Sequence, residues 1–214
     1  MKSILVTMLI SLLLLKPNGG EQKPVEDYSS IEYRGREYKV EEWGLPSGSQ
    51  IIPVRGWYIN GYHIIPKEIK HRGAVLIFGG GEGSCALWNA LEIAYHGYEV
   101  YAMHIYKWVR QTNSKEQVPL ELFAELYLYI QRTAQSPKPL TIYGSSLGAE
   151  LGLLLASTFP EQVDHLILFA PSAYVFQNVY SNPPCSPWTF QGKELPFIST
   201  DGSEEMKTKH LIAF

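Results

Sequence analysis

Cysteine and clustered charge are scarce in this sequence. The only two cysteines, Cys85 and Cys185, lack the CxxC spacing of metal or redox sites. We therefore expect no metal site and two free thiols, with a disulfide as the alternative in an oxidising compartment. Lysine and arginine form no cluster, and the formal net charge of −3 argues against a nucleic-acid partner.

The fraction of charged residues, acidic and basic together, is also modest. The 214 residues are 18% charged and 45% hydrophobic, which is enough apolar material for the core of one globular domain. Aromatic residues reach 13%, a fraction that fits half-buried strands and pocket walls better than disorder. No sequence pattern predicts a cofactor.

A hydrophobic run long enough for a permanent anchor is also absent. The apolar run spans residues 4–15, whereas a bilayer-spanning helix needs about 20 apolar residues. Lys2 precedes the run and Pro17 follows it, which is the layout of a signal sequence. We expect residues 1–20 to direct secretion. The alternative is that they stay uncleaved and anchor the protein to a membrane, with the rest of the chain outside the cytoplasm.

The sequence pattern of the remaining chain predicts a polar linker at residues 21–30 and then one α/β domain over residues 31–214. Short strand-like segments rich in glycine and proline fill residues 31–65 and indicate an antiparallel start to a sheet. Strands and helices then alternate from Ala74 to Ala170. This alternation is typical of a mostly parallel sheet with helices on both faces.

The segment after Pro171 differs from the rest, because it shows no period and many turn residues. A loop of that length inside a domain is usually functional or disordered. Before it, the expected strands cover 74–78, 99–105, 140–143 and 163–170, and the expected helices cover 85–96, 120–134 and 149–158.

A G-x-S-x-G motif lies between the strand and the helix of the segment LTIYGSSLGAELG and is centred on Ser146. A sharp strand-to-helix turn strains the central serine and exposes its hydroxyl, which is the arrangement of a nucleophile elbow. Gly144 and Gly148 permit close approach of neighbouring chain. The pattern predicts Ser146 as the nucleophile and Ser145 as a supporting residue, with a purely structural turn as the alternative.

The glycine loop FGGGEGS follows the strand 74–78 and fits an oxyanion hole. Such a loop supplies one backbone N–H, and the residue after the nucleophile supplies the other. We expect these donors to be Gly80 and Leu147, with Gly79 and Gly81 as the neighbouring choices for the loop.

The same loop has two other interpretations. It is not a phosphate-binding P-loop, because no G-K-[ST] follows. Residues 81–86 do match the G-x-G-x-x-A of dinucleotide-binding folds. The next strand ends in AMHIY, however, without the carboxylate that would hold a ribose. A dinucleotide-binding protein therefore stays a minor alternative.

The acid and base of a triad are not identifiable in this chain. Hydrolases of this kind order them as Ser, then Asp or Glu, then His. Asp201 and His210 stand in that order, but neither follows a recognisable strand of its own. Asp164 and His165 open a strand at the sheet end opposite the elbow, where we expect surface roles. Glu150, one turn beyond the elbow, is interpreted as a solvated or packing residue.

Four segments together resemble one hydrolase family over roughly Tyr38 to Ile198. They are GAVLIFGGGEGSCALWNALEIAYHGYEVYA, LELFAELYLYIQ, IYGSSLGAELGLLLASTFPEQVDHLILFAPS and WTFQGKELPFI. The family is the C-terminal catalytic domain shared by acyl-CoA thioester hydrolases and bile acid-CoA:amino acid N-acyltransferases. The resemblance implies an α/β-hydrolase fold and acyl transfer through a covalent intermediate on Ser146. Serine at this position, rather than the cysteine of the transferases, favours hydrolysis.

The chain also departs from that family. The family's acid and base map beyond Phe214, its animal members carry an extra immunoglobulin-like domain, and coenzyme A thioesters are mainly cytosolic. We therefore expect an incomplete domain whose last strands are missing. The resulting hypotheses are a hydrolase of small acyl thioesters or carboxyl esters, a truncated and inactive hydrolase-fold protein, and a non-catalytic protein that binds acyl ligands.

Overall fold

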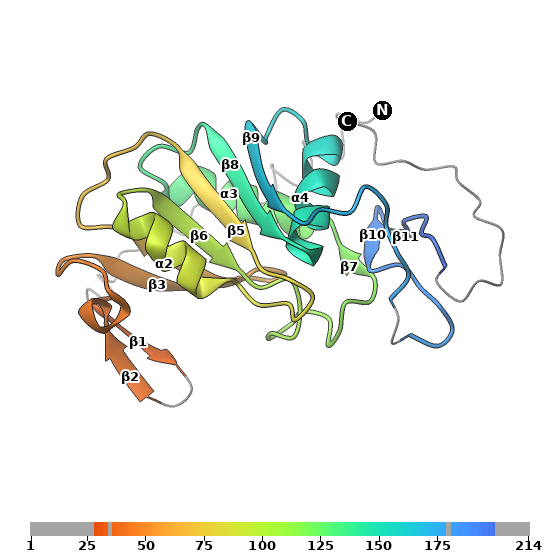
Figure 1. Cartoon of the computed structure of the whole chain (residues 1–214), viewed down its shortest axis with the longest axis horizontal. Helices are drawn as coiled ribbons and strands as arrows, with labels where there is room; N and C mark the ends of the chain where they lie inside the picture. Colours follow the sequence, from red (N-terminus) through yellow and green to blue (C-terminus); the bar gives the residue numbers. More distant parts are fainter. Residues whose placement is uncertain (1–27, 34–35, 179–180, 200–214) are drawn as a thin grey trace, which may run out of the picture.

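A computed structural model describes residues 28–33, 36–178 and 181–199, which form a central sheet flanked by helices (Figure 1). The predicted signal sequence, most of the predicted linker and the Asp201–His210 pair lie outside these residues and stay predictions. N-terminal sequencing of the mature protein would test the first of them. Within the described part, no helix combines the length and apolarity needed to cross a membrane.

The central sheet has six strands in the order β3-β4-β6-β5-β8-β9. Their bounds are β3 Gln50–Arg55, β4 Asn60–Ile65, β5 Ala74–Phe78, β6 Glu99–Met103, β8 Leu140–Ser145 and β9 His165–Phe169. β3, β4 and β6 pair antiparallel, whereas β6, β5, β8 and β9 pair parallel. The predicted antiparallel start and mostly parallel remainder are therefore confirmed.

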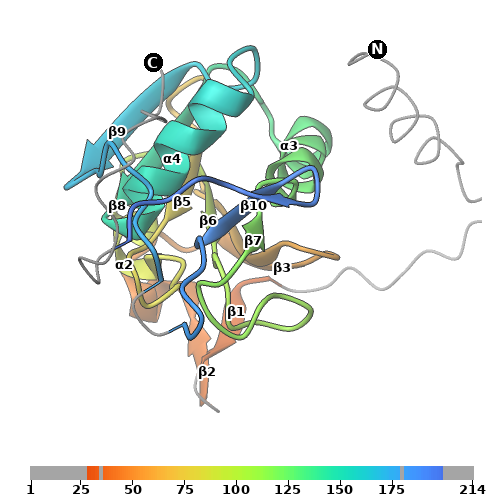
Figure 2. The same cartoon turned by 90° about the vertical axis from the view of Figure 1, so that its right-hand side faces the viewer.

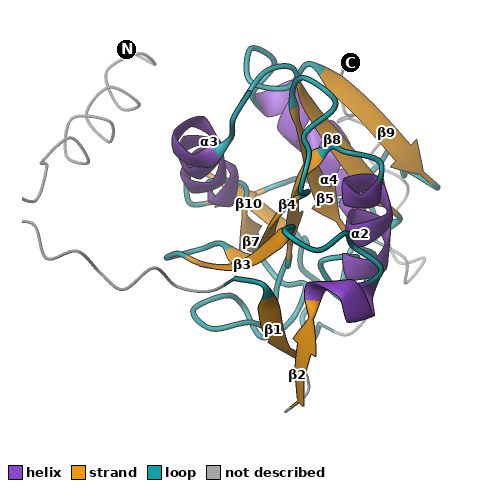
Figure 3. Ribbon diagram, turned by 90° about the vertical axis from the view of Figure 1, so that its left-hand side faces the viewer, coloured by secondary structure: helices purple, strands orange, loops and turns teal. Residues whose placement is uncertain are grey.

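Three α-helices cover the two faces of this sheet. They are α2 Leu87–Tyr95, α3 Leu122–Thr133 and α4 Leu147–Thr158. Figures 2 and 3 show α2 and α3 on opposite sides of the sheet. Alternate residues of β5 enter the two cores: Leu76 and Phe78 join the core of α3 and α4, and Val75 and Ile77 join that of α2. This burial on both faces explains why β5 reads as a continuous apolar run.

Smaller elements surround the sheet. They are β1 Ser30–Tyr33, β2 Arg36–Lys39, the 3-10 helix η1 Val40–Trp43, β7 Val118–Pro119, β10 Trp188–Phe190 and β11 Lys193–Glu194. The segment after Pro171, which shows no period in sequence, supplies β10 and β11. β10 pairs parallel with β7 and antiparallel with β11. Cys85 and Cys185 are free thiols, as expected.

Candidate active site

Ser146 lies at the turn between β8 and α4, and its backbone is strained. Its φ is 52° and its ψ is −114°, a region that non-glycine residues rarely occupy. The Ser146 N–H donates a hydrogen bond to the carbonyl oxygen of Phe169 at 2.8 Å. Its carbonyl oxygen accepts from the N–H groups of Ala149 and Glu150, each at 3.0 Å. The turn is thus held on both sides while the Ser146 side chain is exposed.

The two glycines of the motif are required by close backbone contacts. A Cβ on Gly144 would lie 2.3 Å from the carbonyl oxygen of Gly148. A Cβ on Gly148 would lie 2.3 Å from the carbonyl oxygen of Gly79, at the end of β5. The elbow therefore packs directly against the start of the glycine loop, which is the neighbourhood that an oxyanion hole requires.

The glycine loop closes on itself. The Gly79 N–H donates to the carbonyl oxygen of Ser84 at 3.0 Å, and the Gly83 N–H donates to that of Gly80 at 3.0 Å. The Gly80 N–H donates to the side-chain Oε1 of Glu82 at 3.2 Å. The Ser84 hydroxyl donates to the same oxygen at 2.5 Å and holds the pKa of Glu82 below its usual value. A carboxylate of the chain itself thus occupies the N–H that the sequence assigns to the oxyanion.

The second predicted donor, the Leu147 N–H, is the first of helix α4. No residue in the described ranges accepts a hydrogen bond from it. The N–H groups of a helix's first turn lack partners within the helix and form the positive end of its dipole. Leu147 is therefore suited to receive negative charge. Its role and that of Gly80 stay predictions.

The described residues do not bring a catalytic acid and base to Ser146. No described histidine or carboxylate forms a hydrogen bond with the Ser146 hydroxyl. His63 is buried, and its Nε2 forms a hydrogen bond with Oε1 of Glu99 at 2.7 Å.

The Asp164–His165 pair is also remote from the elbow. Asp164 accepts a hydrogen bond from the Leu140 N–H at 2.6 Å and lies 2.9 Å from the Lys138 ammonium. His165 is exposed at the far end of β9, so this pair has the surface position expected of it.

Of the two interpretations of Glu150, a solvated or a packing residue, the structure supports packing, because only 6% of the residue is exposed. Its Oε1 accepts a hydrogen bond from the indole N–H of Trp188 at 2.6 Å. Burial raises the pKa of Glu150 to about 7, against the lowering effects of Trp188 and Lys115. The sequence did carry a signal for this burial: Glu150 is the one charged residue of α4, which is otherwise apolar up to its last two residues, Ser157 and Thr158. Its hydrogen bond joins the GAELG and WTFQGKELPF segments.

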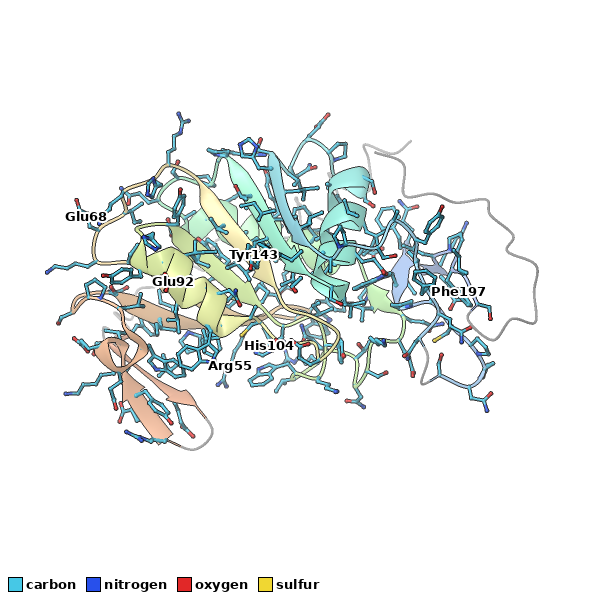
Figure 4. The ribbon with its side chains drawn as sticks, viewed as in Figure 1. Arg55, Glu68, Glu92, His104, Tyr143 and Phe197 are labelled. Atoms are coloured by element: carbon cyan, nitrogen blue, oxygen red, sulfur yellow. The ribbon has the colours of Figure 1, made fainter. Side chains whose placement is uncertain are left out.

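A cleft of about 720 Å³ opens between the glycine loop, the start of α2 and the N-terminal elements. Its lining includes four aromatic side chains, Trp43, Tyr62, Trp88 and Trp108. Gly80 and Ser145 also line it, so the cleft reaches the residue before the predicted nucleophile. Arg55 and His104 line it as well (Figure 4). A concave site of this size, with aromatic walls and polar groups that converge on it, is typical of small-molecule binding.

Comparison with known proteins identifies the fold. No family model and no curated protein matches the chain. Among solved structures, the chain resembles MGS-M1, an α/β-hydrolase enzyme from a deep-sea metagenome library of the Medee basin. The TM-score is 0.52 and the identity 19%, over 71% of this chain and 64% of that one. The chain has an α/β-hydrolase fold.

Two further structures are esterases by name. Carboxylesterase CesB from Bacillus subtilis is 18% identical, with a TM-score of 0.46, over 65% of this chain and 50% of that chain. A bacterial heroin esterase is 13% identical, with a TM-score of 0.47, over 64% and 48%. The chain thus spans about half of the length of these two proteins. The narrower resemblance to acyl-CoA thioester hydrolases stays a prediction.

Proposed function

We propose that this chain belongs to a hydrolase of small carboxyl esters or thioesters, with Ser146 as the nucleophile. The observation that carries the proposal is the strained φ of Ser146 at the junction of β8 and α4. Strained backbone is concentrated at functional sites, and a strained turn of this kind exposes the hydroxyl of its central serine. The glycine contacts that hold this turn against the loop after β5 support the same assignment.

In the proposed reaction, the Ser146 oxygen attacks the acyl carbon and the alcohol or thiol leaves, so that an acyl-enzyme forms. Water then releases the acid and restores the serine. The Leu147 and Gly80 N–H groups would stabilise the oxyanion. A histidine has to take the Ser146 proton and pass it to the leaving group. Asp201 and His210, outside the described residues, stand in the required order. Thioester preference rests on the sequence resemblance alone.

A fluorophosphonate probe tests the nucleophile, because it phosphonylates only activated serines. We expect labelling of the folded protein, none of Ser146→Ala, and retained labelling of the matched Ser145→Ala control. Mass spectrometry of the labelled peptide measures the site. Absence of labelling in folded wild-type protein would contradict the proposal. If an acyl ester also bound Ser146→Ala as tightly as wild type, the result would support the non-catalytic binding protein.

Glu82 is expected to restrain this activity, because its carboxylate holds the Gly80 N–H. Glu82→Ala should raise kcat/KM by about fivefold, since an exposed hydrogen bond of this kind is worth about 1 kcal/mol. Glu82→Gln, which keeps an acceptor but loses the charge, should show a smaller gain. Steady-state hydrolysis of an uncharged ester measures both. A lower kcat/KM in both variants would show that Glu82 contacts the substrate instead.

A further inference from the structure

The cleft is walled by indole rings that are largely open to solvent. Trp88, on α2, is 69% exposed, and Trp108, after β6, is 42% exposed. Leaving such rings in water gives up the apolar burial that a tryptophan normally contributes to stability. Scattered exposed residues need no explanation. Two exposed indoles lining one cleft of about 720 Å³ are a different case, because a bound ligand would cover them together.

Both indoles are held by a neighbouring aromatic ring. Trp108 stacks on His104 with ring centroids 4.4 Å apart and an interplanar angle of 6°. Trp88 packs against Trp43 with centroids 5.0 Å apart and an angle of 46°. Trp43 is buried, so it anchors the exposed ring to the core. Rings fixed in this way lose little conformational entropy when a ligand stacks on them.

The charged groups in the cleft are few and not predominantly basic. Its acidic and basic side chains are Glu32, Arg55, Glu82 and His104. Burial lowers the pKa of His104, so that its ring is neutral at pH 7. The lining therefore carries two carboxylates and one guanidinium. Such a surface repels a polyanionic leaving group, because like charges that face each other across an interface oppose binding.

We propose that this cleft binds the acyl part of an uncharged ester that carries a planar aromatic ring, stacked between Trp88 and Trp108. The inference rests on the proposed function, because the cleft is connected to catalysis through Ser145, which lines it, and through the neighbouring Ser146, the proposed nucleophile. It narrows that function from small esters and thioesters in general to aryl-bearing esters, and it disfavours coenzyme A thioesters.

The experiment measures binding separately from catalysis, by calorimetric titration of Ser146→Ala protein with two matched esters. Ethyl phenylacetate carries the planar ring, and ethyl cyclohexylacetate has a similar size without it. We expect the phenyl ester to bind about fivefold more tightly, in line with the strength of a stacked aromatic pair. Adding Trp88→Ala or Trp108→Ala should remove this preference.

Trp57→Ala is the matched control, because Trp57 is 62% exposed and does not line the cleft. It should leave the preference unchanged. Equal binding of the two esters would overturn the proposal. An equal loss of the preference for the phenyl ester in the Trp57 variant would also overturn it, as would tighter binding of phenylacetyl-coenzyme A than of ethyl phenylacetate. If the ring preference appears while wild-type protein hydrolyses neither ester, the proposed function fails and the binding site stands.

Discussion

Gly148→Ala is expected to lower the free energy of unfolding by about 3 kcal/mol or more, or to prevent folding. The new Cβ would lie 2.3 Å from the carbonyl oxygen of Gly79 and 2.7 Å from that of Phe78. Both obstacles are backbone atoms at the end of β5, so they cannot move as a side chain would. Helix propensity acts in the opposite direction, because alanine is favoured over glycine in a helix by about 1 kcal/mol. The clash is expected to outweigh it.

Urea unfolding followed by circular dichroism measures the effect, and Gly81→Ala is the matched control. A Cβ on Gly81 would meet no atom within 4 Å, so we expect a change within about 0.5 kcal/mol. If both variants were equally stable, the close packing of the elbow against the glycine loop would be wrong. A large loss in the Gly81 variant alone would place the constraint in the loop instead.

Glu150→Gln is expected to make the protein more stable than wild type at pH 8, but not at pH 5. The pKa of Glu150 is raised from its ordinary 4.5 to about 7, so the folded state holds this proton more tightly than the unfolded state. Wild-type stability therefore falls as pH rises from about 4.5 to about 7 and then levels off. A shift of that size corresponds to about 3 kcal/mol. Glutamine has no such loss, because it does not titrate.

Urea unfolding at a series of pH values measures the difference between the two proteins. Trp188→Phe supplies a second variant, since the Trp188 indole lowers the pKa of Glu150. Removing that donor should move the midpoint of the stability loss to higher pH. Parallel stability curves for wild type and Glu150→Gln would show that this carboxyl does not titrate between pH 5 and pH 8.

Much of the candidate site was predictable because its residues are neighbours in sequence. The G-x-S-x-G motif places Ser146 between a strand and a helix, and the structure adds its positive φ. Gly144 and Gly148 were identified by their spacing, and the contacts explain why a Cβ is excluded at each. The carboxylate of Glu82 on the Gly80 N–H was not foreseen. That contact depends on how a six-residue loop closes, which no periodic pattern encodes.

Contacts between distant segments could not be predicted in the same way. Trp188 and Glu150 are 38 positions apart, and their hydrogen bond exists because β10 pairs with β7 beside helix α4. The pairing is short and follows a stretch without period, so sequence alone indicated only a long loop. The cleft walls likewise join η1, α2 and the segment after β6.

The sequence by itself determined the alternation of strands and helices and the sharp strand-to-helix turn centred on Ser146, because these depend on local apolar periodicity and glycine spacing. Tertiary structure alone decided which side chains are desolvated and which groups they contact. It buried Glu150 against Trp188, engaged Glu82 with the glycine loop and gathered exposed indoles around one cleft. Desolvation and ring packing depend on atoms brought together from distant parts of the chain, and a linear pattern does not contain them.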